Sequence, residues 1–201
     1  GERRSSEAGM KYFVYGAFTT AVMLYGMSMI YGVTGQTNLY VIGDVFSGQQ
    51  IAGVQPLLLL AAVLVVVGFA FKTSIVPYHF WAPDVYEGAP TPFTGFLSTA
   101  SKAAGFAVFL RVFLAGTFGP VSTQAEWWAM LVAMCIITMT LGNFVAIYQT
   151  NIKRLLAYSS IAQAGYALIG LVTLTQDGSG ATLFYLLMYV FTNMAAFGVI
   201  I

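Results

Sequence analysis

Charged side chains are scarce in this sequence. Only 15 of its 201 residues, or 7%, are Asp, Glu, Lys or Arg, whereas a soluble domain carries about 25%. Apolar residues make up 59% of the chain. A soluble domain of this length could not bury so much apolar surface, so the composition excludes a soluble enzyme and a disordered chain. We therefore expect a helical membrane protein.

Three further absences narrow the range of functions. The net charge is only +1, so no basic field would attract nucleic acid. Cys135 is the only cysteine and His79 the only histidine, which excludes an internal disulfide and a metal site rich in these residues. The sequence has no glycine-rich phosphate loop, no dinucleotide fingerprint and no Ser-His-Asp set. We expect no cofactor, no metal and no redox chemistry in this chain itself.

Long uncharged runs predict membrane-spanning helices. No charged residue falls within 12–43, 45–71, 155–176 or 178–201, and a spanning helix needs about 20 largely apolar residues. Because backbone groups in lipid must be paired within the segment, these runs predict an all-α polytopic fold. We expect one membrane domain over residues 1–201, with spanning helices at about 12–33, 56–76, 92–115, 127–149, 155–175 and 181–201. The chain lacks an initiating Met and ends within an apolar run, so we expect it to be a piece of a longer protein.

The basic residues predict an orientation. Arginine and lysine occur within residues 3–11, before the first predicted helix, and at 153–154, between the fourth and fifth. With six alternating spans these two places fall on the same side, while Asp44 and Asp177 fall on the other. Cytoplasmic loops carry an excess of lysine and arginine. The start of the first helix and the turn near residue 153 are therefore expected in the cytoplasm.

The segment from Pro77 to Pro92 cannot form one continuous helix. It holds four prolines in 16 residues, and proline removes a backbone donor and clashes with the preceding turn. The segment is nevertheless aromatic and apolar enough to lie inside the protein. Irregular backbone at membrane depth is tolerated where it is buried in protein or lines a wet cavity, and such broken helices recur at transporter ion sites. We predict a helix broken near Pro77, followed by a re-entrant or surface segment.

Lys102 is the strongest functional candidate, because it lies near the middle of the predicted helix 92–115. A lysine at the centre of a membrane helix costs roughly 2.5–3.5 kcal/mol on insertion scales. Small or polar residues accompany it at helical spacing, namely Thr94, Ser98, Ser101 and Gly105. One interpretation is a proton-transfer group that gains and loses a proton as a charged partner moves. The alternative is a buried lysine that pairs with a carboxylate for assembly alone.

Lys72 and His79 are the second and third candidates. Lys72 ends an uncharged run and precedes Pro77 by five residues. It reaches the membrane interface if its helix is ordinary, and lies deeper if the broken segment continues into the protein. Histidine changes charge near neutral pH, so His79 suits a relay between the two lysines. Its alternative role is a hydrogen-bonded core histidine that holds the irregular segment.

Three stretches carry a specific pattern: Lys72 to Pro92 (KTSIVPYHFWAPDVYEGAPTP), Phe96 to Lys102 (FLSTASK) and Asn151 to Ser160 (NIKRLLAYSS). They resemble the antiporter-like membrane subunits of respiratory complex I. The closest resemblance is to subunit N of the proton-translocating NADH–quinone oxidoreductase, which is also the photosynthetic NDH B type. It extends over nearly the whole chain. The resemblance implies a polytopic all-α subunit that belongs to an enzyme complex but has no redox site of its own.

The resemblance also implies roles for particular residues. Lys72 would be the lysine of the broken helix, Lys102 the connecting lysine and His79 a residue of the break. Together they would form a central hydrophilic axis for protons. The family's glutamate partner of Lys72 would precede Gly1, and its second broken helix would follow Ile201.

At the level of the complex, the resemblance implies proton movement coupled to quinone reduction elsewhere. NAD and quinone would be used by the whole complex, with none bound by this chain. The expected partners are other membrane-arm subunits and the lipid bilayer, with no nucleic acid. The expected location is a bacterial inner membrane, or alternatively a thylakoid membrane. Two other functions stay open: a subunit of a multi-subunit cation/proton antiporter, and a structural scaffold of a membrane arm.

Overall fold

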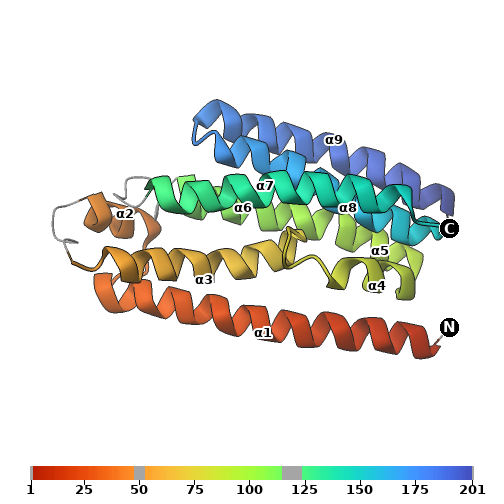
Figure 1. Ribbon diagram of the computed structural model, residues 1–201, viewed down its shortest axis with the longest axis horizontal. Helices are drawn as coiled ribbons and strands as arrows, with labels where there is room; N and C mark the ends of the chain where they lie inside the picture. The colour runs from red at the N-terminus through yellow and green to blue at the C-terminus, as the bar shows by residue number, and fades with distance from the viewer. Residues whose placement is uncertain (1, 48–52, 115–123, 201) are drawn as a thin grey trace.

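The computed structural model describes residues 2–47, 53–114 and 124–200, and all the regular structure of these residues is α-helical. The helices run nearly parallel to one long axis (Figure 1). Their bounds are α1 Glu2–Thr34, α2 Leu39–Ser47, α3 Gln55–Thr73, α4 Trp81–Gly88, α5 Thr91–Ser98, α6 Ala100–Leu114, α7 Gln124–Ile147, α8 Ile152–Val172 and α9 Gln176–Ile200.

Six segments of the described chain are long and apolar enough to cross a membrane. They are Arg3–Thr34, Gln55–Thr73, Thr91–Phe113, Trp127–Ile147, Ile152–Val172 and Gln176–Ile200. This result confirms the predicted all-α fold with about six spans. The first helix begins ten residues earlier than the predicted start at 12, because its charged first turns are helical as well. The predicted helix ends at 115 and 201 lie outside the described residues.

The predicted break in the second spanning helix is confirmed, and it begins before Pro77. Helix α3 ends at Thr73, and Ser74 adopts a left-handed conformation with φ 61°. Two side chains pair backbone groups near the break. The Trp81 indole donates to the Phe71 carbonyl at 2.9 Å, and the Val76 amide donates to Thr138 Oγ1 of α7 at 3.1 Å. These bonds pair backbone groups of the break inside the protein, where a membrane interior requires such pairing.

The predicted span at about 92–115 corresponds to Thr91–Phe113 in the structure, which also divides this span into α5 and α6 at Thr99. The Ser98 and Thr99 hydroxyls both donate to the carbonyl oxygen of Gly95, at 2.9 and 2.7 Å. Such local bonds compete with the helical backbone pattern. Asn193 of α9 also donates to Ser98 Oγ at 2.9 Å, which ties the interruption to a neighbouring helix.

Close helix packing holds the second half of the bundle together. A Cβ atom placed on Gly142 of α7 would lie 2.6 Å from the Ala162 backbone nitrogen of α8. Small residues of this kind let two membrane helices approach closely. The central core is apolar and aromatic, with Phe69 and Phe109 stacked at a centroid distance of 4.9 Å. Helices α3, α6, α7 and α8 contribute side chains to this core, which lies beside the polar site described below.

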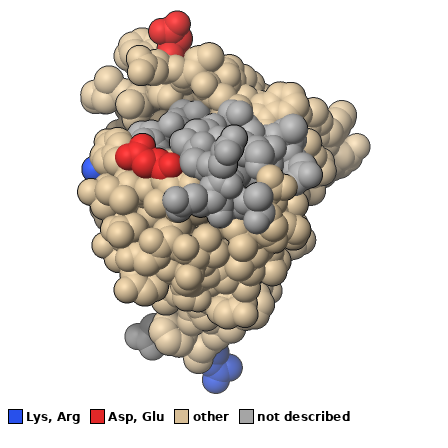
Figure 2. Space-filling view, turned by 90° about the vertical axis from the view of Figure 1, so that its left-hand side faces the viewer, with Lys and Arg blue, Asp and Glu red and all other residues tan. Residues whose placement is uncertain are grey.

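The two ends of the bundle differ in charge. The start of α1, helix α4 and the turn between α7 and α8 lie at one end, together with the C-terminal end of α9 (Figure 1). Helix α2 and the start of α9, which carry Asp44 and Asp177, lie at the other. The space-filling view of that second end is mostly uncharged (Figure 2). The structure thus puts both predicted basic segments at the same end.

Candidate functional site

Lys102 is buried at the contact between α6 and α8. Its side chain is 2% exposed. Its ammonium nitrogen donates to the Ser160 carbonyl at 2.9 Å and to the Ser160 hydroxyl at 2.6 Å. No carboxylate lies within ion-pair distance of Lys102 in the part of the chain that is described. Its hydrogen-bond acceptors are neutral oxygen atoms. The alternative role of Lys102, as a partner of a carboxylate, therefore has no support among the described residues.

A buried polar network extends from Lys102 toward α5 and α9. The Tyr189 hydroxyl donates to Ser160 Oγ at 2.7 Å, and Asn193 Nδ2 donates to Tyr189 at 2.8 Å. Asn193 also donates to Ser98 Oγ. All of these side chains are less than 9% exposed. Of the polar stripe predicted around Lys102, Ser98 and Lys102 itself belong to this network, and their interhelical bonds run to α9 and α8. The Thr94 hydroxyl donates instead to the carbonyls of Pro90 and Tyr86.

Tyr86 reaches the same network from α4. Its hydroxyl lies 3.4 Å from Ser160 Oγ, and its side chain has no exposed surface. Burial raises the pKa of Tyr86, partly offset by the hydrogen bond with Ser160. The phenol is therefore neutral at physiological pH. Helix α4, which follows the break, thus presents a neutral hydroxyl to the Lys102 site.

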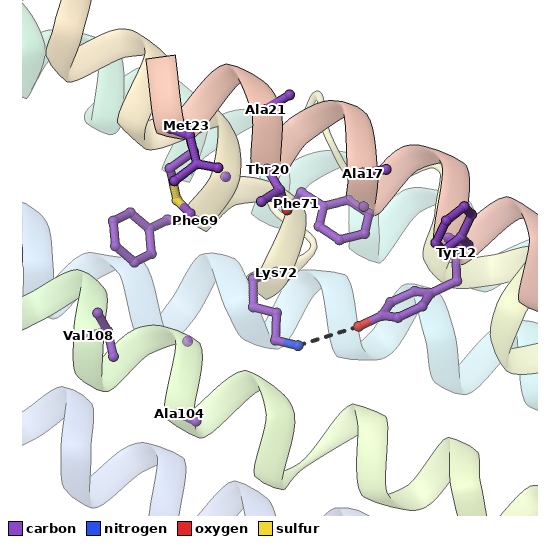
Figure 3. A pocket seen from close by; sticks show the side chains of 15 residues that line it. Tyr12, Ala17, Thr20, Ala21, Met23, Phe69, Phe71, Lys72, Ala104 and Val108 are labelled. Atoms are coloured by element: carbon purple, nitrogen blue, oxygen red, sulfur yellow. Dashed lines mark hydrogen bonds between the residues drawn. The ribbon is translucent and has the colours of Figure 1, made fainter. Parts of the chain in front are cut away.

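Lys72 lies in a separate groove between α1, α3 and α6, with a volume of about 780 Å³ (Figure 3). Its ammonium nitrogen points toward the Tyr12 hydroxyl of α1, at 3.4 Å. The other lining side chains are largely apolar, including Phe71 and Val108. The Lys72 side chain is half-buried and lies in the last turn of α3.

Helix α6 carries Lys102 and also contacts Lys72. A Cβ atom on Gly105 would lie 3.1 Å from Lys72 Cγ, and Gly105 is three residues after Lys102 on the same helix. Residues three apart share a helix face. The described structure has no hydrogen bond between the two lysines themselves. Lys72 and Lys102 therefore lie near the same stretch of α6, but their surroundings differ.

His79 lies in the break, as predicted, with 4% of its surface exposed. Its ring is 4.4 Å from the Phe80 ring, and its Nδ1 has no hydrogen-bond partner among the described residues. Burial lowers the pKa of His79, and a hydrogen bond with the Pro77 backbone opposes this in part. The structure does not bring His79 into hydrogen-bond contact with Lys72 or Lys102.

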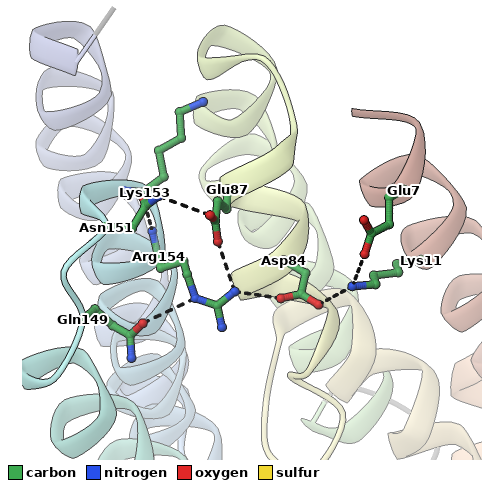
Figure 4. A network of polar contacts seen from close by, with 8 residues as sticks. All are labelled: Glu7, Lys11, Asp84, Glu87, Gln149, Asn151, Lys153 and Arg154. Carbon is green, nitrogen blue, oxygen red and sulfur yellow. Dashed lines mark hydrogen bonds and ion pairs between the residues drawn. The ribbon is translucent and has the colours of Figure 1, made fainter. Parts of the chain in front are cut away.

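An ionic cluster joins α1, α4 and α8 at the end of the bundle where α1 begins (Figure 4). Asp84 accepts hydrogen bonds from Lys11 at 2.7 Å and from Arg154 at 2.8 Å. Arg154 also donates to Glu87 at 3.2 Å. The sequence pattern assigned no functional role to Asp84 or Glu87. Their positions in the proline-rich segment give no sign that two distant basic residues converge on them.

The cluster sets the charge state of Asp84. Burial alone would raise the pKa of its carboxyl group. The hydrogen bonds from Lys11 and Arg154 outweigh that effect and hold the pKa below its ordinary value. Asp84 is therefore ionised at neutral pH and fastens α4 to α1 and α8. These pairs are about one-third exposed, and such pairs contribute only about 0–1 kcal/mol each.

A polar cleft of about 440 Å³ lies between α8 and α9. Its lining includes Gln163, Tyr185, Tyr189 and Asn193. The Tyr185 hydroxyl donates to Gln163 Oε1. Because Tyr189 and Asn193 belong to the buried network as well, the cleft adjoins the Lys102 site. Neither Gln163 nor Asn193 can titrate, so the cleft supplies polarity without a charge.

The described residues thus define a polytopic helical membrane bundle with one broken helix, a fully buried lysine and a second lysine at the break. No group of three or more His, Cys, Asp or Glu side chains within this part of the chain could hold a metal ion. The chain belongs to the family described as NADH:quinone oxidoreductase/Mrp antiporter, TM, which matches residues 1–201.

Known proteins that are similar to this chain make the family assignment more specific. The chain is 52% identical to NADH-quinone oxidoreductase subunit N of Moorella thermoacetica over 198 residues, which cover 98% of this chain and 40% of that protein. It is 41% identical, with a TM-score of 0.78, to a chain of the structure titled respiratory complex I from Thermus thermophilus with bound aureothin. That match covers 96% of this chain and 40% of the other.

A chain of the Mrp complex from Dietzia sp. shares the fold, with 24% identity and a TM-score of 0.81 over 96% of this chain and 34% of the other. The chain spans about 40% of the length of the curated relatives it matches. Its six apolar helices, its family and its bacterial relatives make it a multi-pass bacterial membrane protein.

Proposed function

We propose that this chain is a section of a proton-translocating membrane-arm subunit of NADH–quinone oxidoreductase. Its similarity to subunit N over nearly its whole length supports the class of complex. The observation that carries the proton-transfer role is Lys102, which is 2% exposed and hydrogen-bonded only to neutral partners in the described structure. An intramembrane ionisable residue is costly, which favours a function in ion or proton movement.

In the proposed mechanism, Lys102 and Lys72 gain and lose protons as charges elsewhere in the complex change. Lys102 lies in a buried polar network, where gain or loss of a proton strongly changes the strength of the surrounding hydrogen bonds. Lys72 faces a large groove, in which its ammonium group contacts the Tyr12 hydroxyl. His79 would act in the break between α3 and α4. The redox chemistry, with NAD and quinone, would take place in other subunits, and this chain would bind neither.

The surface of the chain supports a membrane location with further protein partners. Large apolar side chains are exposed along α1 and α9, including Phe13 at 70% and Phe184 at 63%. Exposed apolar area of this extent requires lipid or another protein surface. We propose that the bilayer and other membrane-arm subunits cover it. A cation/proton antiporter subunit is a second function compatible with the family, and identity to subunit N favours the first.

The test is Lys102→Ala in the full protein within its complex. The expected result is a complex that assembles and oxidises NADH while translocating fewer protons per electron pair in membrane vesicles. Arg111→Ala is a matched control, because Arg111 is an exposed basic residue of the same helix, nine positions later. Unchanged proton stoichiometry in Lys102→Ala would refute the role of this lysine. Failure of assembly in Lys102→Ala alone would instead support a structural scaffold.

A further inference from the structure

Among the described residues, Lys102 donates both of its hydrogen bonds to one residue, Ser160 of α8. The carbonyl of Ser160 accepts at 2.9 Å and its hydroxyl at 2.6 Å. Ser160 is 1% exposed. A buried ammonium group without a carboxylate partner depends on such acceptors, because burying an unpaired charge is very unfavourable. The surroundings of Lys102 are thus dominated by a residue for which the sequence gave no functional role.

The hydrogen bonds around the Ser160 hydroxyl have a defined direction. A serine hydroxyl offers one donor and two acceptor positions. Lys102 Nζ and the Tyr189 hydroxyl both donate to Ser160 Oγ, at 2.6 and 2.7 Å. With both acceptor positions occupied, the Ser160 hydrogen can only be donated. Its remaining neighbour is the Tyr86 hydroxyl, at 3.4 Å. The network is therefore oriented as long as Lys102 carries its proton.

Loss of that proton changes what Lys102 needs from Ser160. A neutral amine has a lone pair and can accept a hydrogen bond, whereas an ammonium group can only donate. A serine hydroxyl rotates easily to suit its partner. When the amine forms, the Ser160 hydrogen can turn from Tyr86 to Lys102 Nζ. The same side chain can thus satisfy both forms of the lysine without a movement of the helices.

We propose that Ser160 is the positioning residue of Lys102, and that its hydroxyl accepts from the ammonium form and donates to the amine form. Ser160 itself keeps its hydrogen, and only the direction of one hydrogen bond changes. This inference rests on the proposed proton-transfer role of Lys102. It adds a residue on a different helix, which would allow Lys102 to change charge while it remains buried.

The titratable groups near this site fit that role. Tyr86 of α4 and Tyr189 of α9 face the Ser160 hydroxyl with their own hydroxyl groups. From α3, Lys72 packs against Gly105, one turn along α6 from Lys102. A second positive charge so near would oppose protonation of Lys102. Helix α5 contributes the uncharged hydroxyl of Ser98 to the network. The Ser160 acceptors are therefore the contacts that favour the charged form.

The test compares proton pumping against pH for Ser160→Ala and Ser160→Thr in the full complex. Hydrogen bonds to charged groups are about twice as strong as neutral ones, so loss of the hydroxyl harms the ammonium form more than the amine form. In Ser160→Ala, the pH of half-maximal pumping should therefore fall by about one unit or more. Ser160→Thr, which keeps the hydroxyl, should restore the wild-type profile. NADH oxidation should be unchanged in both.

Two further variants make the result decisive. Ser160→Cys nearly keeps the size but accepts hydrogen bonds weakly, so it should shift the profile in the same direction even where Ala disturbs packing. Ser159→Ala removes the neighbouring hydroxyl, which has no hydrogen bond to Lys102, and should leave the profile unchanged. Unshifted profiles in the Ala and Cys variants, with pumping lost in Lys102→Ala, would overturn this inference alone. Normal pumping in Lys102→Ala would overturn the proposed function and this inference together.

Discussion

Thr138 offers a sharp test of how the break between α3 and α4 is held. Its side chain is fully buried in α7, and its hydroxyl accepts a hydrogen bond from the Val76 amide at 3.1 Å. The hydroxyl also donates to the Met134 carbonyl of its own helix at 2.5 Å. The substitution Thr138→Val keeps the shape of the side chain and leaves the Val76 amide without a partner. A buried unsatisfied donor costs about 1–3 kcal/mol.

Thr140 supplies the matched control on the same helix. Its hydroxyl donates to the Ile136 carbonyl four residues earlier, as that of Thr138 does to Met134, and its side chain is exposed. Thr140→Val therefore removes a comparable local bond and leaves the break intact. The difference between the two variants isolates the bond to Val76.

Hydrogen–deuterium exchange of the full-length protein in nanodiscs can measure this difference. Peptides covering residues 74–80 should exchange about 5- to 150-fold faster in Thr138→Val, which corresponds to the 1–3 kcal/mol above. In Thr140→Val the same peptides should exchange as in the wild type. Equal exchange in the two variants would refute the claim that α7 holds the break through this bond.

Two other predictions concern the groove and the ionic cluster. Gly105→Val should displace the Lys72 side chain, because even the first added carbon would lie 3.1 Å from Lys72 Cγ. We expect this variant to pump fewer protons while it oxidises NADH normally. Normal pumping would contradict this packing. The lowered pKa of Asp84 means that its pairs with Lys11 and Arg154 stabilise the fold fully above about pH 4 and lose this effect as the pH falls through the folded-state pKa. Asp84→Asn should therefore lower thermal stability at pH 7 by a small amount, and the gap from the wild type should close in acid; a gap that is constant with pH would contradict the pairing.

Much of the fold could be predicted because its causes are local in the sequence. Uncharged runs of sufficient length locate the spanning helices, and the prolines of 77–92 locate the break. The interruption at Thr99 could not be predicted in this way. It depends on two hydroxyls that both turn back to the Gly95 carbonyl, and serine and threonine occur in many continuous membrane helices. The bond from Asn193, which lies on a distant helix, also contributes.

The candidate site could be predicted only in part. The depth of Lys102 follows from its place in an uncharged helix, and the structure confirms its burial. Its partner Ser160 lies 58 residues away, and this contact depends on how α6 and α8 pack. One signal was available on α9, where Tyr189 and Asn193 are polar residues four positions apart in an apolar helix. Four-residue spacing places both on one face, where they line the buried network.

The ionic cluster shows a similar limit. The distribution of basic residues predicts that Lys11 and Arg154 lie on the same side of the membrane, and the structure puts them at the same end. That prediction does not extend to a shared partner. Asp84 can reach both because α4 turns back between α1 and α8 after the break, and the path of an irregular segment depends on tertiary contacts that the sequence pattern does not contain.

Proton translocation by Lys102→Arg measures the central claim most directly. Arginine keeps the positive charge and cannot be deprotonated in proteins. If Lys102 must load and release a proton, Lys102→Arg should assemble and oxidise NADH yet translocate as few protons per electron pair as Lys102→Ala. Wild-type proton stoichiometry in Lys102→Arg would contradict the account, because a fixed positive charge would then be sufficient at this position.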